Sequence, residues 1–208
     1  MDRPNRSGTT YGLLVTRPFR QQIDDGILDR AAALFARRGF AKTSVQDVAD
    51  AVGLSKAGLL HHFPSKDALH DAVLAQADTL GRRVLDQLGD LPAGPARDRR
   101  ALEVLVDVAL AHPGLVALML APVTDLGAEP EPAVTDLVLQ AFGVDPDTTE
   151  PQRLVRVVGA LAALAVLTLA AHAQDQTTAW RQHIVATCFD ALGHRRPDAA
   201  PHPDQVEA

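Results

Sequence analysis

The segment from Ser55 to His62 holds the side chains of this chain that are best suited to contact a nucleic acid. If the segment is helical, Leu59 and Leu60 point partly inward, which leaves a small, polar and basic outer face. A helix that enters the major groove of DNA and approaches phosphates needs such a face. The residues on it are Lys56, Ala57, Gly58, His61 and His62. The segment therefore indicates nucleic-acid recognition.

Residues that could serve catalysis or metal binding are few and poorly placed. All four serines lie before residue 66, so the longer C-terminal part of the chain has no serine nucleophile. Cys188 falls on an apolar helical stripe, where a buried structural role is expected. His61 and His62 are neighbours, about 100° apart around a helix, and cannot easily share a metal ion. We predict no enzyme activity, metal site or cofactor, although convergence of three scattered histidines stays open: His112, His172 and His183.

Two short helices are predicted to position this segment. The first has one apolar face, because apolar residues recur with helical spacing at Val45, Val48, Ala49 and Val52. We expect Thr43 to cap its start, with Gln46 reaching back to the capping residue, and Gly53 to end it. Ser55 then caps the second helix, which is predicted to run from Lys56 to about His62. The very short connection forces the two helices to cross steeply. The pattern predicts a helix-turn-helix.

Longer helices are predicted on both sides of this motif. Before it, Pro18 suits the first turn of a helix that Gly39 ends and whose apolar side packs against the motif. After it, a helix runs from Lys66 to about Leu88, with apolar residues at steps of three and four. Because this helix connects the motif to the rest of the chain, a change in its tilt would move the DNA-contacting surface.

Charge is divided unevenly along the chain. Residues 1–70 carry ten Lys or Arg against seven Asp, a net charge of +3. Residues 71–208 carry ten Arg against nineteen Asp or Glu, a net charge of −9. All three lysines, Lys42, Lys56 and Lys66, lie in the first part, where they could approach phosphates. The net charge of −6 therefore does not argue against DNA binding.

The rest of the chain consists of apolar helical patterns separated by Gly- and Pro-rich loops, with nothing that resembles a strand. One of these patterns predicts a short helix from Leu115 to Leu120 that stops before Pro122. We therefore predict an all-α fold of about nine helices. The longest apolar region is Thr149 to Ala173. A membrane span there is the alternative, but the region is rich in Ala, and Arg156 and His172 bound its uncharged part. We expect this helix to be buried by its own domain and by a partner. The polar N-terminal residues do not resemble a secretory signal, so we expect a cytoplasmic protein.

Residues 26–69, GILDRAAALFARRGFAKTSVQDVADAVGLSKAGLLHHFPSKDAL, resemble the N-terminal domain of TetR-type transcriptional regulators. The similarity holds at nearly every position that marks the family. The chain departs from it at Gly58, Leu59 and Leu60, where the family often has Thr-Leu-Tyr. The resemblance implies a homodimeric repressor whose two helix-turn-helix heads read successive major grooves of a palindromic operator in double-stranded DNA.

The resemblance also divides the chain and assigns its DNA contacts. It implies a helix-turn-helix domain at 17–65 and a helical regulatory and dimerisation domain at 66–192. The composition of the two ends predicts a flexible arm at 1–16 and a disordered tail at 193–208. Lys56, His61 and His62 would face the bases, and Arg17 or Arg20 would lie at the flank. The full set of predicted DNA-binding residues is Thr43, Ser44, Ser55, Lys56, Ala57, Gly58, His61, His62 and Lys66, of which Thr43, Ser44 and Lys66 would contact phosphates.

In such regulators the last two helices form the dimer interface, as a four-helix arrangement across the twofold axis. The predicted interface residues are Leu161, Ala165, Thr168, Trp180, Ile184 and Cys188. A small hydrophobic or amphipathic effector would bind the regulatory domain and release the protein from DNA. The predicted lining is Val106, Leu110, Leu118, Met119, Phe142 and Leu164. Two alternatives stay open: a constitutive regulator without an effector, and a small-molecule-binding protein that keeps the fold without binding DNA.

Overall fold

The computed structural model describes residues 16–124 and 132–194 of the 208-residue chain. Within these ranges it contains nine α-helices and no strand, which confirms the predicted all-α class. The helices are α1 (Thr16–Arg38), α2 (Val45–Val52), α3 (Lys56–His62), α4 (Lys66–Leu88), α5 (Pro95–Ala111), α6 (Pro113–Thr124), α7 (Pro132–Ala141), α8 (Pro151–Ala173) and α9 (Thr177–Ala191). The predicted arm, apart from Thr16, and the predicted tail, apart from Gly193 and His194, lie outside the described residues.

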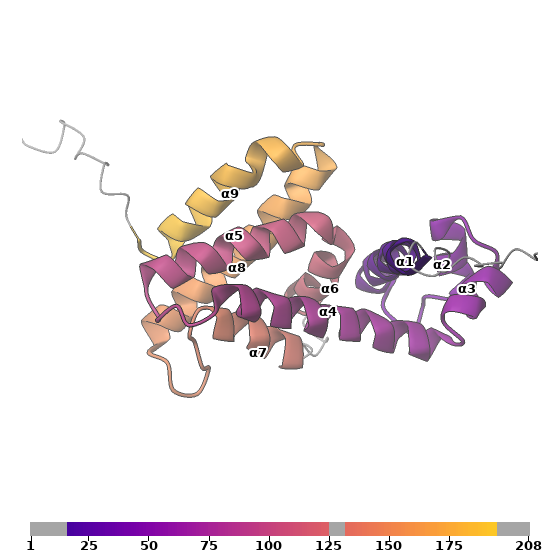
Figure 1. Cartoon of the computed structure of the whole chain (residues 1–208), viewed down its shortest axis with the longest axis horizontal. Coiled ribbons are helices and arrows are strands. Elements are labelled where there is room, and N and C mark those ends of the chain that lie inside the picture. Colours follow the sequence, from indigo (N-terminus) through magenta and orange to yellow (C-terminus); the bar gives the residue numbers. More distant parts are fainter. Residues whose placement is uncertain (1–15, 125–131, 195–208) are drawn as a thin grey trace, which may run out of the picture.

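Figure 1 shows two groups of helices joined by the long helix α4. Helices α1, α2 and α3 lie at one end of the molecule, and α5, α7, α8 and α9 lie at the other. Helix α6 lies between the groups and packs against α1. The smaller group is the predicted N-terminal helix-turn-helix domain and the larger group is the helical domain that follows it. Their predicted division between residues 65 and 66 stays a prediction.

Helix α4 contributes to two hydrophobic cores. Leu69 and Val73, in its first half, are buried with side chains of α1, α2 and α3. Val84 and Leu88, near its end, are buried with side chains of α5, α7, α8 and α9. A helix of 23 residues is about 35 Å long, because each residue adds about 1.5 Å. The two cores are therefore joined by one continuous helix, as the spacing of its apolar residues predicted.

Helix α6 is the second connection between the two groups. It follows α5 after a bend of 104°, and its residue Leu115 is buried in the core of the helix-turn-helix domain. The backbone N–H of Leu115 donates to Oδ1 of Asp29 in α1, at 3.1 Å. A Cβ atom at Gly114 would overlap the carbonyl oxygen of Asp29, so only glycine lets α6 approach α1 this closely. The close contact between α6 and α1 thus requires glycine at position 114.

Two predicted helix ends near α6 are wrong. The sequence pattern placed a short helix between residues 115 and 120 that stopped before Pro122, whereas α6 begins at Pro113 and continues to Thr124. Proline suits the first turn of a helix, because its missing N–H would have no partner there. Pro122 removes one helical hydrogen bond, and its place close to the end of α6 limits the disruption.

Helix α8 is apolar on its packed side and on part of its open side. By length and composition alone it could cross a membrane, with a mean hydropathy of 2.3. It packs against α5, α6 and α9. On the other side three large apolar residues are open to solvent: Val155 is 70% exposed, Val158 51% and Val166 54%. One face of α8 therefore has no partner within the described part of the chain.

Cys188 is completely buried in the core of the larger domain, and this burial raises the pKa of its thiol to about 11. At pH 8 only about one thiol in a thousand would be ionised, and the thiolate is the reactive form. We expect iodoacetamide to leave native Cys188 unlabelled under conditions that label the denatured protein completely. Mass spectrometry of intact protein measures the labelled fraction. Rapid labelling without denaturant would mean that α9 separates from the core.

Candidate DNA interface

The start of α2 is set by a reciprocal pair of hydrogen bonds one residue later than predicted. Oγ of Ser44 accepts from the N–H of Asp47 at 3.1 Å, and Oδ2 of Asp47 accepts from the N–H of Ser44 at 2.8 Å. The prediction that Thr43 and Gln46 form this capping box was therefore wrong. Thr43 is 1% exposed, and its hydroxyl donates to the carbonyl oxygen of Gly39 at 2.9 Å. Burial of Thr43 leaves the exposed Ser44 as the cap.

The carboxylate of Asp47 has a lowered pKa, chiefly because Ser44 donates hydrogen bonds to it from its side chain and backbone, and further because Arg38 lies 3.0 Å away. A carboxyl group with a lowered folded-state pKa stabilises the fold above its unfolded pKa and loses that effect as the pH falls through the folded pKa. We expect Asp47→Asn to be less stable than wild type at pH 7 and equally stable once wild-type Asp47 is protonated. Urea unfolding between pH 7 and pH 2 tests this, and a difference independent of pH would contradict it.

Helix α3 has the bounds that the sequence predicted. Oγ of Ser55 accepts from the N–H of Gly58 at 3.0 Å and caps its start. The preceding α2 ends at Gly53, which has the left-handed φ of 73° expected of a helix-ending glycine. Leu59 is fully buried and holds α3 against the core. Lys56, in the first turn, is exposed.

The exposed side of α3 and of its cap contains part of the predicted DNA-binding set. Ala57 and His61 are exposed with Lys56, and Gly58 is half-buried. Ser44 and Ser55, the two helix caps, are exposed as well. These residues form a surface with the positive charge of Lys56 at the start of α3. The other side chains on it are small, apart from the imidazole of His61. This surface can approach a groove closely and place a cation near a phosphate.

Other members of the predicted set are occupied by contacts within the domain. Nδ1 of His62 lies 2.7 Å from Oδ1 of Asp24 in α1, and the His62 side chain is only 20% exposed. Nζ of Lys66 donates to the carbonyl oxygen of Phe40 at 2.9 Å and lies 4.1 Å from the centre of the Phe40 ring. His62 thus holds the end of α3 against α1, and Lys66 holds the start of α4 against the turn that follows α1. The sequence carried no signal for Asp24, because it lies 38 residues from its partner.

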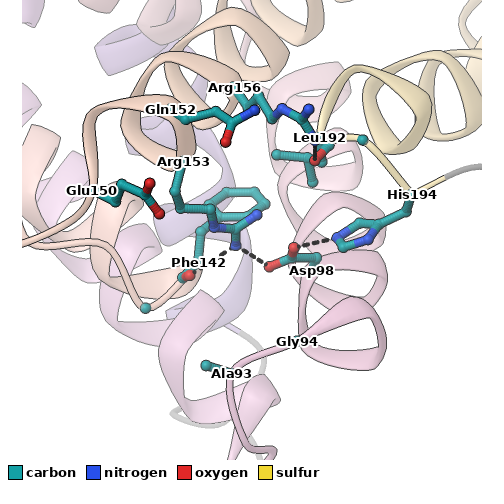
Figure 2. Close-up of a pocket in the computed structure, with 12 residues that line it drawn as sticks. Ala93, Gly94, Asp98, Phe142, Glu150, Gln152, Arg153, Arg156, Leu192 and His194 are labelled. Atoms are coloured by element: carbon teal, nitrogen blue, oxygen red, sulfur yellow. Dashed lines mark hydrogen bonds and ion pairs between the residues drawn. The ribbon is translucent and has the colours of Figure 1, made fainter.

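The predicted effector-binding residues do not surround one described cavity. Val106, Phe142 and Leu164 are buried in the core of the larger domain. Leu118 and Met119 pack against the core of the helix-turn-helix domain instead. Leu110 is half-buried against the first of these cores. The pocket drawn in Figure 2 has several charged side chains in its wall, and Phe142 is the one member of the predicted set that lines it.

The predicted dimer residues divide into buried and half-buried ones. Thr168, Ile184 and Cys188 are at most 2% exposed, so their side chains have no free surface to offer a second chain. The apolar stripe of α9 faces the chain's own core, which the sequence pattern alone did not reveal. Leu161, Ala165 and Trp180 are half-buried. The open apolar residues of α8, which include Val155, Val158 and Val166, were missing from the predicted set.

Metal-ligand side chains do not gather in the described part of the chain. Within residues 16–124 and 132–194, no group of three or more His, Cys, Asp or Glu side chains could hold a metal ion. The described histidines that could have converged have other surroundings. Nε2 of His172, for example, lies 2.6 Å from the carbonyl oxygen of Leu110.

Comparison with known proteins agrees with this geometry. Residues 27–73 match the family model described as bacterial regulatory proteins, tetR family. The HTH-type transcriptional repressor KstR2 of Rhodococcus jostii (strain RHA1) is 40% identical over 84 residues, and the match spans 38% of this chain and only 38% of that repressor's length. An uncharacterised HTH-type transcriptional regulator of Mycobacterium tuberculosis (strain ATCC 25618 / H37Rv) is 29% identical over 147 residues, 67% of this chain and 73% of that protein. The crystal structure of a TetR-family regulator from Bordetella parapertussis 12822 has a TM-score of 0.53 and 25% identity, covering 85% of this chain and 99% of that one.

The all-α fold and the capped, solvent-exposed α3 are those of a helix-turn-helix protein. Residues 27–73 form a DNA-binding domain of the tetR family of bacterial regulatory proteins, which confirms the resemblance seen in residues 26–69. These relatives are named as regulators of transcription, in line with the prediction that the chain is not an enzyme.

Proposed function

We propose that this chain is a cytoplasmic, homodimeric repressor that binds a palindromic DNA operator and is released from it by a small effector. The main observation in support of this proposal is the solvent-exposed surface of α3. Lys56, Ala57 and His61 lie on a helix whose two ends are both held in place, by the Ser55 cap and by the contact between His62 and Asp24. A recognition helix fixed in this way can present its side chains to a major groove without first becoming ordered.

We assign DNA contacts to those predicted residues whose side chains are exposed to solvent. We assign contacts with bases or phosphates to Lys56, Ala57 and His61 on α3, and phosphate contacts to the cap residues Ser44 and Ser55. Gly58 is half-buried, and its lack of a side chain lets the helix backbone approach the groove. The polar atoms of Thr43, His62 and Lys66 are bonded within the domain, so we assign these residues to holding the surface in place and not to contacting DNA.

The proposed dimer forms through α8 and α9. A palindromic operator presents two half-sites about 34 Å apart, so two helix-turn-helix heads must be held by a twofold interface. The open apolar face of α8 supports such an interface, since contiguous apolar surface of this kind is rarely left in water. Leu161, Ala165 and Trp180 would lie at its edge. Thr168, Ile184 and Cys188 would support it from the core.

The proposed effector would act through α6. Leu118 and Met119 on this helix are half-buried and apolar, which suits a hydrophobic or amphipathic molecule. The same helix contacts α1 through Leu115 and Asp29, so a molecule that moved α6 would also move the helix-turn-helix domain. Such a ligand would release DNA only by binding more tightly to the conformation that cannot bind the operator.

The experiment for this proposal selects bound duplexes from a random pool with purified full-length protein at two salt concentrations. We expect enrichment of a palindrome, with binding that weakens as salt rises because phosphate contacts release counterions. Lys56→Ala should weaken binding to the selected site at least tenfold and reduce the salt dependence by about one ion. The matched control is Arg83→Ala, which removes an exposed positive charge from α4. No enriched sequence, or equal losses in the two variants, would reject α3 as the DNA-reading surface.

A further inference from the structure

A pocket of about 440 Å³ lies at the end of the larger domain far from the helix-turn-helix. Its walls come from the start of α5, the loop before α8, the first turns of α8 and the residues that follow α9. Figure 2 shows that polar side chains surround it, among them Asp98, Glu150, Arg153, Arg156 and His194. Its size suits a small molecule. Neither the proposed DNA surface nor the proposed effector surface on α6 includes these side chains.

One side of the pocket is a cluster of polar side chains around Asp98. The Asp98 side chain is 1% exposed, and each of its carboxylate oxygens has its own partner. Nη2 of Arg153 lies 2.7 Å from Oδ1, and Nε2 of His194 lies 2.7 Å from Oδ2. Arg153 also donates to the carbonyl oxygen of Phe142 at 3.1 Å. The charges of Asp98 and Arg153 therefore offset each other, and the cluster holds three segments of the chain together as a rigid wall.

Arg156 is the positively charged residue of the pocket that takes no part in the Asp98 cluster. Within the described residues its guanidinium pairs with no carboxylate, and its recorded hydrogen bond is a long one, 3.4 Å to the carbonyl oxygen of Leu192. The guanidinium lies against Gly193, where a Cβ atom would overlap it, so glycine leaves the space that it occupies. An arginine side chain has five N–H donors in a planar fork that matches carboxylate and phosphate oxygens. Most of these donors have no hydrogen-bond partner in the part of the chain that the structure describes.

Two helix starts add positive potential to the same pocket. Helix α5 begins after Gly94 and α8 begins after Glu150, both of which line the pocket, and neither helix has a side-chain cap. The first N–H groups of a helix lack intrahelical partners and carry a partial positive charge. Each of these two helices begins with a proline, which has no N–H, so the contribution comes from the potential of the helix end more than from free donors. Glu150 is the remaining negative group, and Figure 2 shows it on the opposite side of Arg153 from Asp98 and His194. It reduces the attraction for an anion without occupying Arg156.

We propose that this pocket binds a small anion that carries a phosphate or carboxylate group, with Arg156 as the residue that pairs with it. The starts of α5 and α8 add a weaker positive potential, and the Asp98 cluster holds the wall of the pocket in place. The site does not depend on the proposed DNA binding or effector response. A chain in which either of those fails would still bind the anion.

Isothermal titration calorimetry of the full-length protein with inorganic phosphate and, separately, with citrate tests the proposal at constant ionic strength in chloride buffer. At least one probe should bind, and the probe that binds more tightly identifies the preferred anionic group. Arg156→Gln should weaken binding at least tenfold, because it removes a charge-assisted hydrogen-bond donor. Glu150→Gln should tighten binding several-fold, because it removes a like charge from the wall.

Two controls separate this pocket from other cationic surfaces. Arg83→Gln removes an exposed charge on α4 and should leave binding unchanged. Lys56→Ala should also leave it unchanged, which distinguishes the pocket from the proposed DNA-phosphate contact. Circular dichroism confirms that each variant is folded. Absence of binding by both probes would overturn the proposal, and so would equal binding by wild type and Arg156→Gln, or a loss of binding in Lys56→Ala alone.

Discussion

Replacing Gly114 with alanine is expected to lower the free energy of unfolding by about 2 to 3 kcal/mol, at the upper end of what overpacking costs. The added methyl group would overlap the carbonyl oxygen of Asp29, and backbone atoms cannot rotate away as a flexible side chain can. Either α6 must withdraw from α1 or the methyl group must distort the helix. Both changes weaken the hydrogen bond from the N–H of Leu115 to Asp29 and the packing of Leu115 in the core.

The matched control is Gly26→Ala, which makes the same chemical change within α1. A Cβ atom at Gly26 would have no atom within 4 Å, and the position lies inside a helix. Alanine is there expected to stabilise the protein by up to about 1 kcal/mol, because it favours the helix more than glycine does. Urea unfolding of both variants measures the two opposite effects. A Gly114→Ala protein as stable as Gly26→Ala would show that α6 does not approach α1 as closely as the structure indicates.

Replacing Val158 with aspartate is expected to weaken the proposed dimer at least a hundredfold. Val158 is 51% exposed in the single chain and lies on the open apolar face of α8 between Val155 and Val166. In a twofold dimer the substitution buries two carboxylates without partners, one from each chain, and uncompensated buried charge is costly. Operator binding should fall with dimerisation, because each head would then bind its half-site alone. Sedimentation equilibrium measures the dimer directly.

Ala75→Asp provides the comparison for this substitution, since it adds the same charge at an exposed position of α4. It should leave the sedimentation behaviour of the protein unchanged. A dimer that survives Val158→Asp would move the interface to another face of the molecule. The proposed use of α3 for DNA would then have to be tested separately with single half-sites.

Sequence reasoning located the helix-turn-helix accurately because the interactions that define it are local. Helix α3 and helix α4 both have their predicted bounds, Lys56–His62 and Lys66–Leu88. Ser55 and Ser65 cap the N–H groups of residues three positions later. A serine, a helical spacing of apolar residues and a glycine that can adopt positive φ are all visible in a single sequence.

The capping of α2 shows where this local reasoning ends. Thr43 and Ser44 are adjacent, and both have a hydroxyl that can cap a helix. Thr43 is buried with its hydroxyl bonded to Gly39, so Ser44 takes the cap with Asp47. Burial depends on how α1 packs beside α2, which the residues around the cap do not specify.

The sequence by itself determined the helix-turn-helix, the all-α class and the order of its helices, because these depend on caps, breakers and periodicity within one or two helical turns. Tertiary structure alone decided which of those residues are free to act. It paired His62 with Asp24 and Asp98 with His194, over separations of 38 and 96 residues. It also turned the apolar stripe of α9 toward the chain's own core and left three valines of α8 exposed. Contacts between distant segments arise only when the helices pack, and no local pattern encodes which face each helix presents to another.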